Sequence, residues 1–325
     1  MRCLRGDHAE GGCTAGRQPG TIDPGVEPLT GPGTILARIR SRDRGSYILI
    51  SPYLVFFGAF VAYPLIFSLI LLFHRWNIVT PMEWVGAKNF LRVAEDALFY
   101  KSVLNTVLFL LIHIPLQIVV AIGFALLLNS RVRGRGLFRA VYFFPVVVSG
   151  VAVTILWQQI YANDYGVLNT LFQAVGLPAV PWLTDPSIAM PSIAIMATWK
   201  NVGIYIVLFL AGLQNIPADL YEAAAIDGAS PFRRFWNITL PMLNPTVSVV
   251  IVLSTIGGFS LFIEPYVLTG GGPMQSTLSG MLYIYNQAFY FSHMGYAATL
   301  GVVYALVILT VVLIQRKVIE RETGM

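Results

Sequence analysis

The chain has 325 residues, of which 56% are apolar and 11% charged, and its mean hydropathy is +0.70. Soluble globular domains average about 25% charged residues, so the composition excludes such a domain and predicts a polytopic membrane protein. The formal net charge of +5 indicates contact with membrane lipid. Nucleic acid is not expected as a partner.

The first segment, residues 1–45, is rich in Gly, Pro and Arg and shows no apolar period. It is predicted to be a disordered cytoplasmic tail that precedes a membrane domain of residues 46–325. Its cysteines, Cys3 and Cys13, are not followed within reach by the apolar segment of a cleaved signal peptide, so none is predicted. These cysteines are expected to be reduced thiols. A structural metal site usually takes four ligands, so two cysteines are not expected to form one.

Six stretches are long and apolar enough to cross a bilayer, which takes about 20 helical residues. They are expected at residues 47–73, 102–129, 138–161, 188–213, 246–263 and 296–314. Lipid offers no partner for backbone polar groups, so each stretch is predicted to be a helix.

Basic residues gather at alternate ends of these spans. The loops 162–187 and 265–295 contain no Lys or Arg, and the first outer loop is an exception in which basic and acidic residues mix. The basic groups on the other side are Arg38, Arg40, Arg42, Arg44, Arg131, Arg133, Arg135, Arg139, Arg233, Arg234, Arg316, Lys317 and Arg321. Because positive residues stay on the cytoplasmic side, both termini and the segment 222–241 are predicted to be cytoplasmic.

A polar segment, residues 222–241, separates the fourth and fifth predicted spans. Pro217 suits the first turn of a short helix that is expected to run to Asp227, and three consecutive alanines favour that helix. Gly228 is predicted to take the left-handed conformation that ends it.

Ser230 and Pro231 then predict the start of a second short helix, which is expected to end at Leu240, before a proline. Helical spacing places four of its residues on one face: Phe232, Phe235, Trp236 and Thr239. Two interpretations stay open from the residues alone. The helix lies at the lipid interface, or it docks into a groove of a cytoplasmic partner.

The spacing of Glu222-Ala223-Ala224, Gly228, Ile238 and Leu240-Pro241 resembles the EAA loop of ABC-importer permease subunits at every motif position. The similarity extends over roughly residues 45–325. It implies an all-α membrane domain of six transmembrane helices, the type I ABC importer fold, whose coupling loop, residues 215–244 here, inserts into a separate ATP-binding subunit. The residues implied in ATPase docking are Glu222, Ala223, Ala224, Asp227, Gly228, Ala229, Ser230, Pro231 and Phe232.

Two further segments are similar to the carbohydrate type of this family, in particular the maltose-type first permease subunit. They are Ala-Gly-Leu-Gln-Asn-Ile-Pro at residues 211–217 and Leu-Thr-Gly-Gly-Gly-Pro at residues 268–273. In that family the spans flanking the loop line the substrate path. The matching positions are Ala197, Lys200, Asn201, Ile204, Ser254, Gly258, Leu261 and Ile263. Several are small or apolar, which implies a sugar other than maltose or one bound mainly by a partner subunit.

Lys200 is the most informative single residue of these spans. A lysine near the centre of a membrane helix costs about 2.5 to 3.5 kcal/mol unless it faces a polar cavity or a partner, so it is expected to face the path. The alternative is that the span boundaries are shifted and the lysine snorkels to the interface. Direct pairing with Glu264 is not expected, because Glu264 falls near the outer end of the fifth span.

No phosphate-binding loop of the form Gly-x-x-x-x-Gly-Lys-Ser/Thr occurs in the sequence, and no metalloprotease or serine-hydrolase motif does. The chain is therefore predicted not to be an enzyme, with ATP and magnesium held by partner subunits. The leading function is a permease subunit that imports a mono-, di- or oligosaccharide by alternating access. The alternatives are an ABC permease for glycerol-phosphate, an amino acid or an osmolyte, and an ion-driven secondary transporter.

The resemblance also implies partners. They are a second permease subunit, two ATP-binding subunits and an extracytoplasmic solute-binding protein, in addition to membrane lipid. The expected location is the cytoplasmic (inner) membrane of a prokaryote.

Overall fold

The computed structural model describes residues 48–130 and 134–323. The predicted tail 1–45, with Cys3 and Cys13, lies outside the described residues, and so do Arg131 and Arg133. The chain divides into two units, residues 1–64 and 65–325, and each is described by itself.

In the first unit, residues 48–57 are helical and continue into a π-helical turn, η1 (Gly58–Ala62), and the start of α2 (Tyr63–Leu71). Pro64 lies two residues after the π-helical turn, inside the continuous helix, so its missing N–H removes one backbone hydrogen bond there. Most side chains of this stretch are apolar and exposed, among them Leu49 and Phe60. The whole helix, Ile48–Leu71, is long and apolar enough to cross a membrane.

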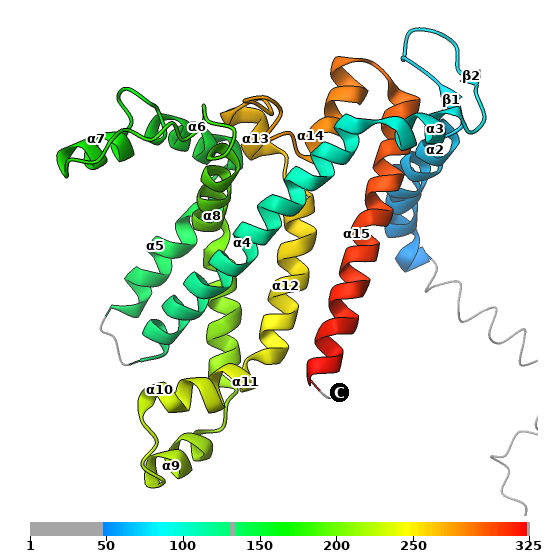
Figure 1. Cartoon of the computed structure of the whole chain (residues 1–325). Coiled ribbons are helices and arrows are strands. Elements are labelled where there is room, and N and C mark those ends of the chain that lie inside the picture. Colours follow the sequence, from blue (N-terminus) through cyan, green and yellow to red (C-terminus); the bar gives the residue numbers. More distant parts are fainter. Residues whose placement is uncertain (1–47, 131–133, 324–325) are drawn as a thin grey trace, which may run out of the picture. The chain divides into compact units, whose positions relative to one another are not determined.

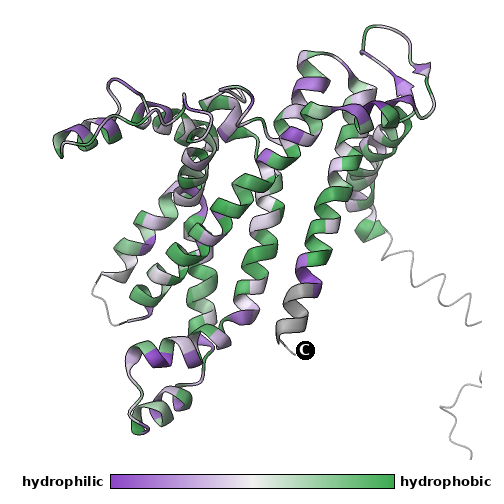
Figure 2. Cartoon of the chain, viewed as in Figure 1, coloured by the Kyte–Doolittle hydropathy of each residue, from purple (hydrophilic) through white to green (hydrophobic). Residues whose placement is uncertain are grey.

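In the second unit, two long helices form the centre. They are α4 (Ala97–Asn129) and α8 (Ala189–Gln214), and they pack against each other (Figure 1). α5 (Arg135–Val147) packs on α8, α12 (Asn244–Phe259) packs on both central helices, and α15 (Met294–Thr323) packs on α12. The long helices are largely hydrophobic along their length, and hydrophilic residues gather towards their ends (Figure 2). This pattern fits helices that meet lipid on their outer faces.

The described residues hold four helices that could each cross a membrane, or six if two bent pairs each count as one span. The third predicted span, residues 138–161, is wrong as a straight helix. It consists of α5 and α6 (Gly150–Ile160), which meet at an angle of 100°. Pro145 removes a hydrogen bond from the last turn of α5, and Val148 is extended, so the helix ends there.

The fifth predicted span, residues 246–263, also differs. The helix α12 ends at Phe259, and a new short helix, α13 (Ile263–Leu268), begins after a break at residues 260–262. Two glycines, Gly257 and Gly258, weaken the last turn. The Ser260 amide closes that turn by donating to the carbonyls of Ile256 and Gly257.

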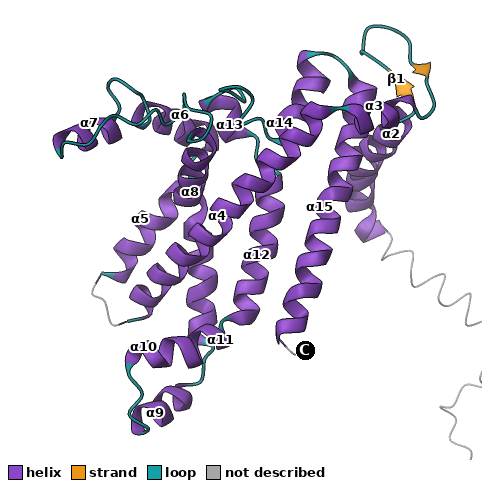
Figure 3. Cartoon of the chain, viewed as in Figure 1, coloured by secondary structure: helices purple, strands orange, loops and turns teal. Residues whose placement is uncertain are grey.

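Shorter elements lie at the two ends of the unit. The coupling loop occupies one end with α9 (Ala218–Ile226), α10 (Pro231–Arg234), the π-helical turn η2 (Phe235–Thr239) and α11 (Leu240–Met242). At the opposite end lie α3 (Lys88–Glu95), α7 (Val167–Ala174), α13, α14 (Gly280–Tyr285) and η3 (Asn286–Tyr290). The described strands, β1 (His74–Arg75) and β2 (Glu83–Trp84), form one small antiparallel pair at that end (Figure 3).

Candidate functional site

A cavity of about 280 Å³ lies among α4, α8, α12 and α13. All eight predicted substrate-path residues line it: Ala197, Lys200, Asn201, Ile204, Ser254, Gly258, Leu261 and Ile263. Its wall also contains residues that the sequence interpretation had not assigned to the path, namely Phe109, His113, Tyr205, Gly257, Ser260 and Glu264. The structure thus brings the predicted positions together, and their role in binding stays a prediction.

Helical spacing explains how α8 contributes so much of this wall. Ala197, Lys200, Asn201 and Ile204 follow one another at the intervals that repeat on one helix face. Ser254 and Gly258 are likewise one turn apart on α12. Two helix faces therefore form most of the wall, and α4, the break after α12 and α13 complete it.

Lys200 and Glu264 form an ion pair inside this cavity. The Lys200 ammonium donates to Glu264 Oε1 over 2.8 Å, and the two side chains are only 15% and 9% exposed. The prediction that this pairing would not form is wrong. It assumed one continuous fifth span, whereas the break at residues 260–262 returns Glu264 to the side of α8.

A third segment meets the pair at Gly150, the first residue of α6. A Cβ atom at this position would lie 2.9 Å from Lys200 Nζ and 3.4 Å from Ile263 Cδ1. Any residue larger than glycine at this position would therefore displace the Lys200 ammonium. The bend between α5 and α6 brings the start of α6 to the cavity, which a straight third span would not predict.

Buried hydrogen bonds connect α4 to both walls. The Gln117 amide donates to Ser254 Oγ over 2.7 Å, and His113 Nδ1 lies 2.8 Å from Thr198 Oγ1. Because Thr198 Oγ1 already donates to the Ala194 carbonyl over 2.8 Å, His113 is the donor in its contact. His113 is thus a packing residue that also touches the cavity.

A wider hollow of about 620 Å³ lies near the end of α6, beside Tyr161, Leu268 and Pro273. Its described lining holds no charged side chain and none of the predicted path residues. The smaller cavity, with its ion pair, is the better candidate for a binding site. In the described residues, no group of three or more His, Cys, Asp or Glu is placed to hold a metal ion.

The coupling loop has the predicted turn. Gly228 takes a left-handed backbone with φ of +74°, and the Ala229 amide donates to the Ala224 carbonyl over 2.9 Å to close α9. Ser230 caps α10 by accepting from the Arg233 amide at 3.3 Å, with Pro231 in the first turn. These local predictions are confirmed.

The second helix of the loop is longer than predicted. It does not end at Leu240 but continues through η2 to Met242, and α12 then starts at an angle of 62°. The Leu240 amide donates to the Phe235 carbonyl in the wider π-helical pattern. Pro241 consequently lies inside the continuous helix, just after the π-helical turn, and its missing N–H removes one backbone hydrogen bond there.

The predicted single face of this helix is divided. Phe235 and Thr239 turn inward, and the Thr239 hydroxyl lies 2.9 Å from that of Tyr221 on α9. Phe232 and Trp236 remain 74% and 51% exposed, with their rings 6.1 Å apart. The π-helical turn changes the angular spacing along the helix, so residues that a regular helix would align separate into two groups.

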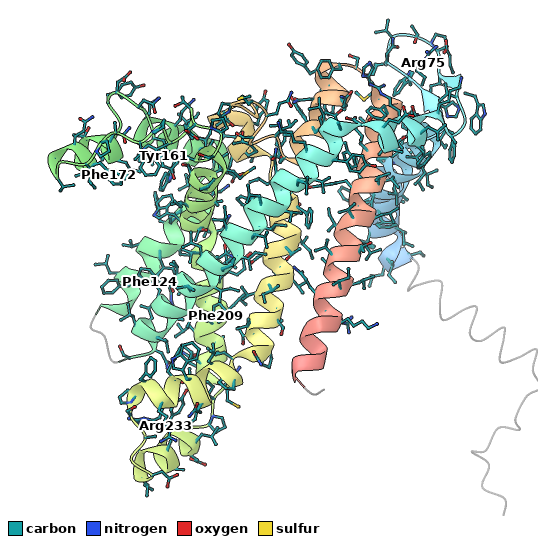
Figure 4. The ribbon with its side chains drawn as sticks, viewed as in Figure 1. Arg75, Phe124, Tyr161, Phe172, Phe209 and Arg233 are labelled. Carbon is teal, nitrogen blue, oxygen red and sulfur yellow. The ribbon has the colours of Figure 1, made fainter. Side chains whose placement is uncertain are left out.

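The residues implied in docking share one end of the molecule. Glu222, Ala223 and Ala224 lie on α9, residues 227–230 form the turn, and Pro231 and Phe232 begin α10; all are exposed or half-buried. Figure 4 shows Arg233 on this end and Tyr161 at the opposite one. The docking of a partner on these residues stays a prediction.

A bundle of apolar helices that encloses a polar cavity fits a membrane transport component. Residues 100–324 match the family described as binding-protein-dependent transport system inner membrane component, and the chain belongs to this family. It is accordingly a multi-pass inner-membrane protein of a prokaryote, and the predicted resemblance is confirmed.

Named relatives cover most of the chain. It is 38% identical over 275 residues to the lactose transport system permease protein LacF of Rhizobium radiobacter, covering 83% of this chain and 92% of that one. It is 39% identical over 241 residues to the trehalose/maltose transport system permease protein MalF of Thermococcus litoralis, covering 74% and 82%.

The fold also matches a solved structure. A chain in the crystal structure of a bacterial alginate ABC transporter, in complex with an alginate pentasaccharide-bound periplasmic protein, superposes with a TM-score of 0.76. The match covers 88% of this chain and 97% of that one at 24% sequence identity. At this identity the likeness is one of fold.

Proposed function

We propose that this chain is the permease subunit of an ABC importer that carries a sugar across the membrane by alternating access. The observation that supports this most is the cavity among α4, α8, α12 and α13. It gathers the positions that match the substrate path of maltose-type permeases, in a wall with a few polar groups among apolar ones. The names of the lactose and the trehalose/maltose relatives support a sugar as cargo.

The proposed topology has six transmembrane helices with both termini cytoplasmic. It counts each bent pair as one crossing, and it rests on the distribution of Lys and Arg. The domain boundaries proposed are a tail of residues 1–45 and a transmembrane domain of residues 46–325.

Energy for transport would come from separate ATP-binding subunits, because the sequence contains no phosphate-binding loop. In this proposal they dock on the coupling loop at residues 222–224 and 227–232, where exposed apolar and acidic groups lie together. Closure of the ATPases would move the loop and, through α11 and α12, one wall of the cavity. One chain supplies one loop, so a second permease subunit completes the importer.

The extracytoplasmic partner is a solute-binding protein. The family description, binding-protein-dependent transport, supports this assignment. The loops 162–187 and 265–295, which contain no Lys or Arg, lie on the proposed outer side.

The proposal is tested by reconstituting the chain with the companion permease, ATPases and binding protein encoded beside it. Uptake of radiolabelled lactose, trehalose and maltose into vesicles is then measured. Uptake that requires both ATP and the binding protein supports the proposal. Uptake driven by an ion gradient without ATP, or ATP-driven uptake only of amino acids, glycerol-phosphate or an osmolyte, contradicts it.

A further inference from the structure

The ion pair leaves much of its hydrogen-bonding capacity unused. An ammonium has three donors and a carboxylate two acceptor oxygens, yet in the described residues the only hydrogen bond of this pair is Lys200 Nζ to Glu264 Oε1. Both residues line the cavity. The remaining N–H groups and Glu264 Oε2 are therefore available to a molecule that enters it.

The pair also sets the charge of the cavity. Lys200 and Glu264 are the basic and the acidic residue in its described lining, and their charges cancel. The other polar groups there, such as Asn201 and Tyr205, are uncharged. An entering molecule thus meets strong local dipoles without a net charge.

The short separation of the two charges decides which cargo fits. An anion that reaches the Lys200 ammonium also comes close to the Glu264 carboxylate, because the two groups are 2.8 Å apart. Like charges held together in a poorly screened site repel strongly. A sugar hydroxyl meets no such conflict, since it can accept from the ammonium and donate to the carboxylate.

The rest of the wall suits an uncharged sugar ring. Phe109 presents an aromatic ring, stacked on that of His113 with centroids 4.9 Å apart, and Ile204 and Leu261 add apolar surface. Sugar rings carry apolar C–H faces between their hydroxyl edges, so they use both kinds of surface. The cavity offers both, with the ion pair for the hydroxyl edges and the apolar side chains for the C–H faces.

We propose that Lys200 and Glu264 act as a charge filter, in which Glu264 is the specificity-determining residue that restricts the cavity to uncharged polyhydroxy cargo and rejects acidic sugars. This inference rests on the proposed function, because it takes the cavity as the place where the cargo binds. Removing the negative charge without changing its shape would expose the ammonium and admit an anion.

The test measures binding to the purified complex of both permeases and both ATPases in nanodiscs, without the binding protein, so that selection by that protein cannot mask the cavity. The probes are radiolabelled maltose, lactose and trehalose, and digalacturonate as the acidic counterpart. The variants are E264Q, K200M/E264Q and the charge-swapped K200E/E264K. The matched control is E83Q, because Glu83 also forms an ion pair, with Arg75, but at the exposed β1–β2 pair.

E264Q is expected to bind digalacturonate at least about tenfold more tightly than the wild-type complex does. The gain should disappear in K200M/E264Q, and E83Q should show none. K200E/E264K restores a neutral pair and is expected to reject the anion as the wild type does; it also serves if E264Q fails to assemble.

The inference is overturned if E264Q binds the anion no better than the wild type, or if the gain persists without Lys200. Tight anion binding by K200E/E264K overturns it as well. A wild-type complex that binds no neutral sugar in nanodiscs and imports none in the vesicle assay defeats the proposed function instead. The comparison of anion binding between E264Q and the wild type does not depend on that result.

Discussion

The Tyr221 hydroxyl lies 2.9 Å from Thr239 Oγ1 and so joins α9 to the π-helical turn η2. Thr239 is only 4% exposed, and Phe235 and Ile238 beside it pack on the cluster that includes Leu243 at the start of α12. The two short helices of the coupling loop are thereby held to each other and to the long helix that forms one wall of the cavity. A displacement of α9 would be transmitted to α12 through this contact.

The first prediction concerns this hydrogen bond. Y221F removes one hydroxyl and leaves Thr239 Oγ1 buried without that partner, at an expected cost of about 1 kcal/mol in local stability. We expect ATP hydrolysis to continue while the number of sugars imported per ATP falls. The ratio is measured in reconstituted vesicles, with Y100F as control because the Tyr100 hydroxyl lies at the opposite end of the unit. An unchanged ratio in Y221F would remove the contact from the coupling route.

The second prediction uses the left-handed turn. Gly228 has φ of +74°, a conformation that costs an alanine about 1–2 kcal/mol. G228A is therefore expected to weaken retention of the ATPase subunits during purification. The matched control is Gly123 in α4, where no atom lies within 4 Å of the position that a Cβ would take. G123A should therefore leave retention of the ATPase subunits intact and slightly stabilise the helix. If G228A and G123A retain the ATPase subunits equally well, the left-handed turn at Gly228 is not required for docking.

The third prediction concerns the stability of the ion pair. Removing one member of a buried pair leaves an uncompensated charge and costs about 3–5 kcal/mol, whereas replacing both with apolar residues is often neutral. K200M is therefore expected to destabilise the purified complex strongly, and K200M/E264L to recover most of the loss. Thermal unfolding of the four members of the cycle checks this. Additive losses would show that the two side chains do not interact.

The fourth prediction follows from Gly150. An added Cβ would press on the Lys200 ammonium at 2.9 Å, so G150A should shift this flexible side chain and weaken sugar binding several-fold without loss of assembly. Gly301 in α15 has open space around a Cβ, and G301A is the matched control. Binding of labelled sugar to the purified complex distinguishes them. If G150A and G301A bind the sugar with the same affinity, the position of the Lys200 ammonium does not affect sugar binding.

The fifth prediction concerns pH and Asp96, the residue that caps α4. Burial alone would raise the pKa of Asp96, but hydrogen bonds from the Tyr283 and Tyr296 hydroxyls and from two backbone amides lower it below its ordinary value of 3.8. A lowered pKa stabilises the folded state above that ordinary value, and the contribution is lost as pH falls through the folded value. The effect should stay below about 1 kcal/mol because solvent partly screens the group.

D96N cannot titrate, so the part of the acid destabilisation that belongs to Asp96 should be absent in this variant. Thermal unfolding from about pH 5 down to about pH 3 measures it. If D96N and the wild type lose stability in parallel over this range, the account of Asp96 is wrong.

The turn of the coupling loop could be predicted because its signals are local, since Gly228 and Ser230 specify a turn and a cap through their own backbone chemistry. The positions Ala197, Lys200 and Asn201 came instead from the resemblance to maltose-type permeases, and their spacing explains why they share one helix face. The hydropathy of an apolar stretch does not show where the helix bends. The breaks after Val147 and Phe259 were therefore missed, although Pro145 and Gly257-Gly258 are signals that favour them.

The missed pairing of Lys200 with Glu264 follows from the second break. A continuous helix to residue 263 would carry Glu264 beyond the cavity, at a rise of about 1.5 Å per residue. The actual chain turns after Phe259 and brings Glu264 back to α8. Contacts that depend on such a turn are tertiary, and the sequence pattern of one span does not contain them.

In the proposed function, ATP hydrolysis in a separate subunit drives this chain through its coupling loop. The most direct measurement is ATP-dependent sugar uptake by vesicles that contain the full importer, with F232A compared with F144A. Phe232 and Phe144 are 74% and 67% exposed, but only Phe232 lies on the loop. We predict that F232A lowers uptake and ATPase retention at least about tenfold, as loss of an aromatic anchor does, while F144A leaves both near wild type. Full ATPase retention and coupled uptake in F232A would contradict the claim.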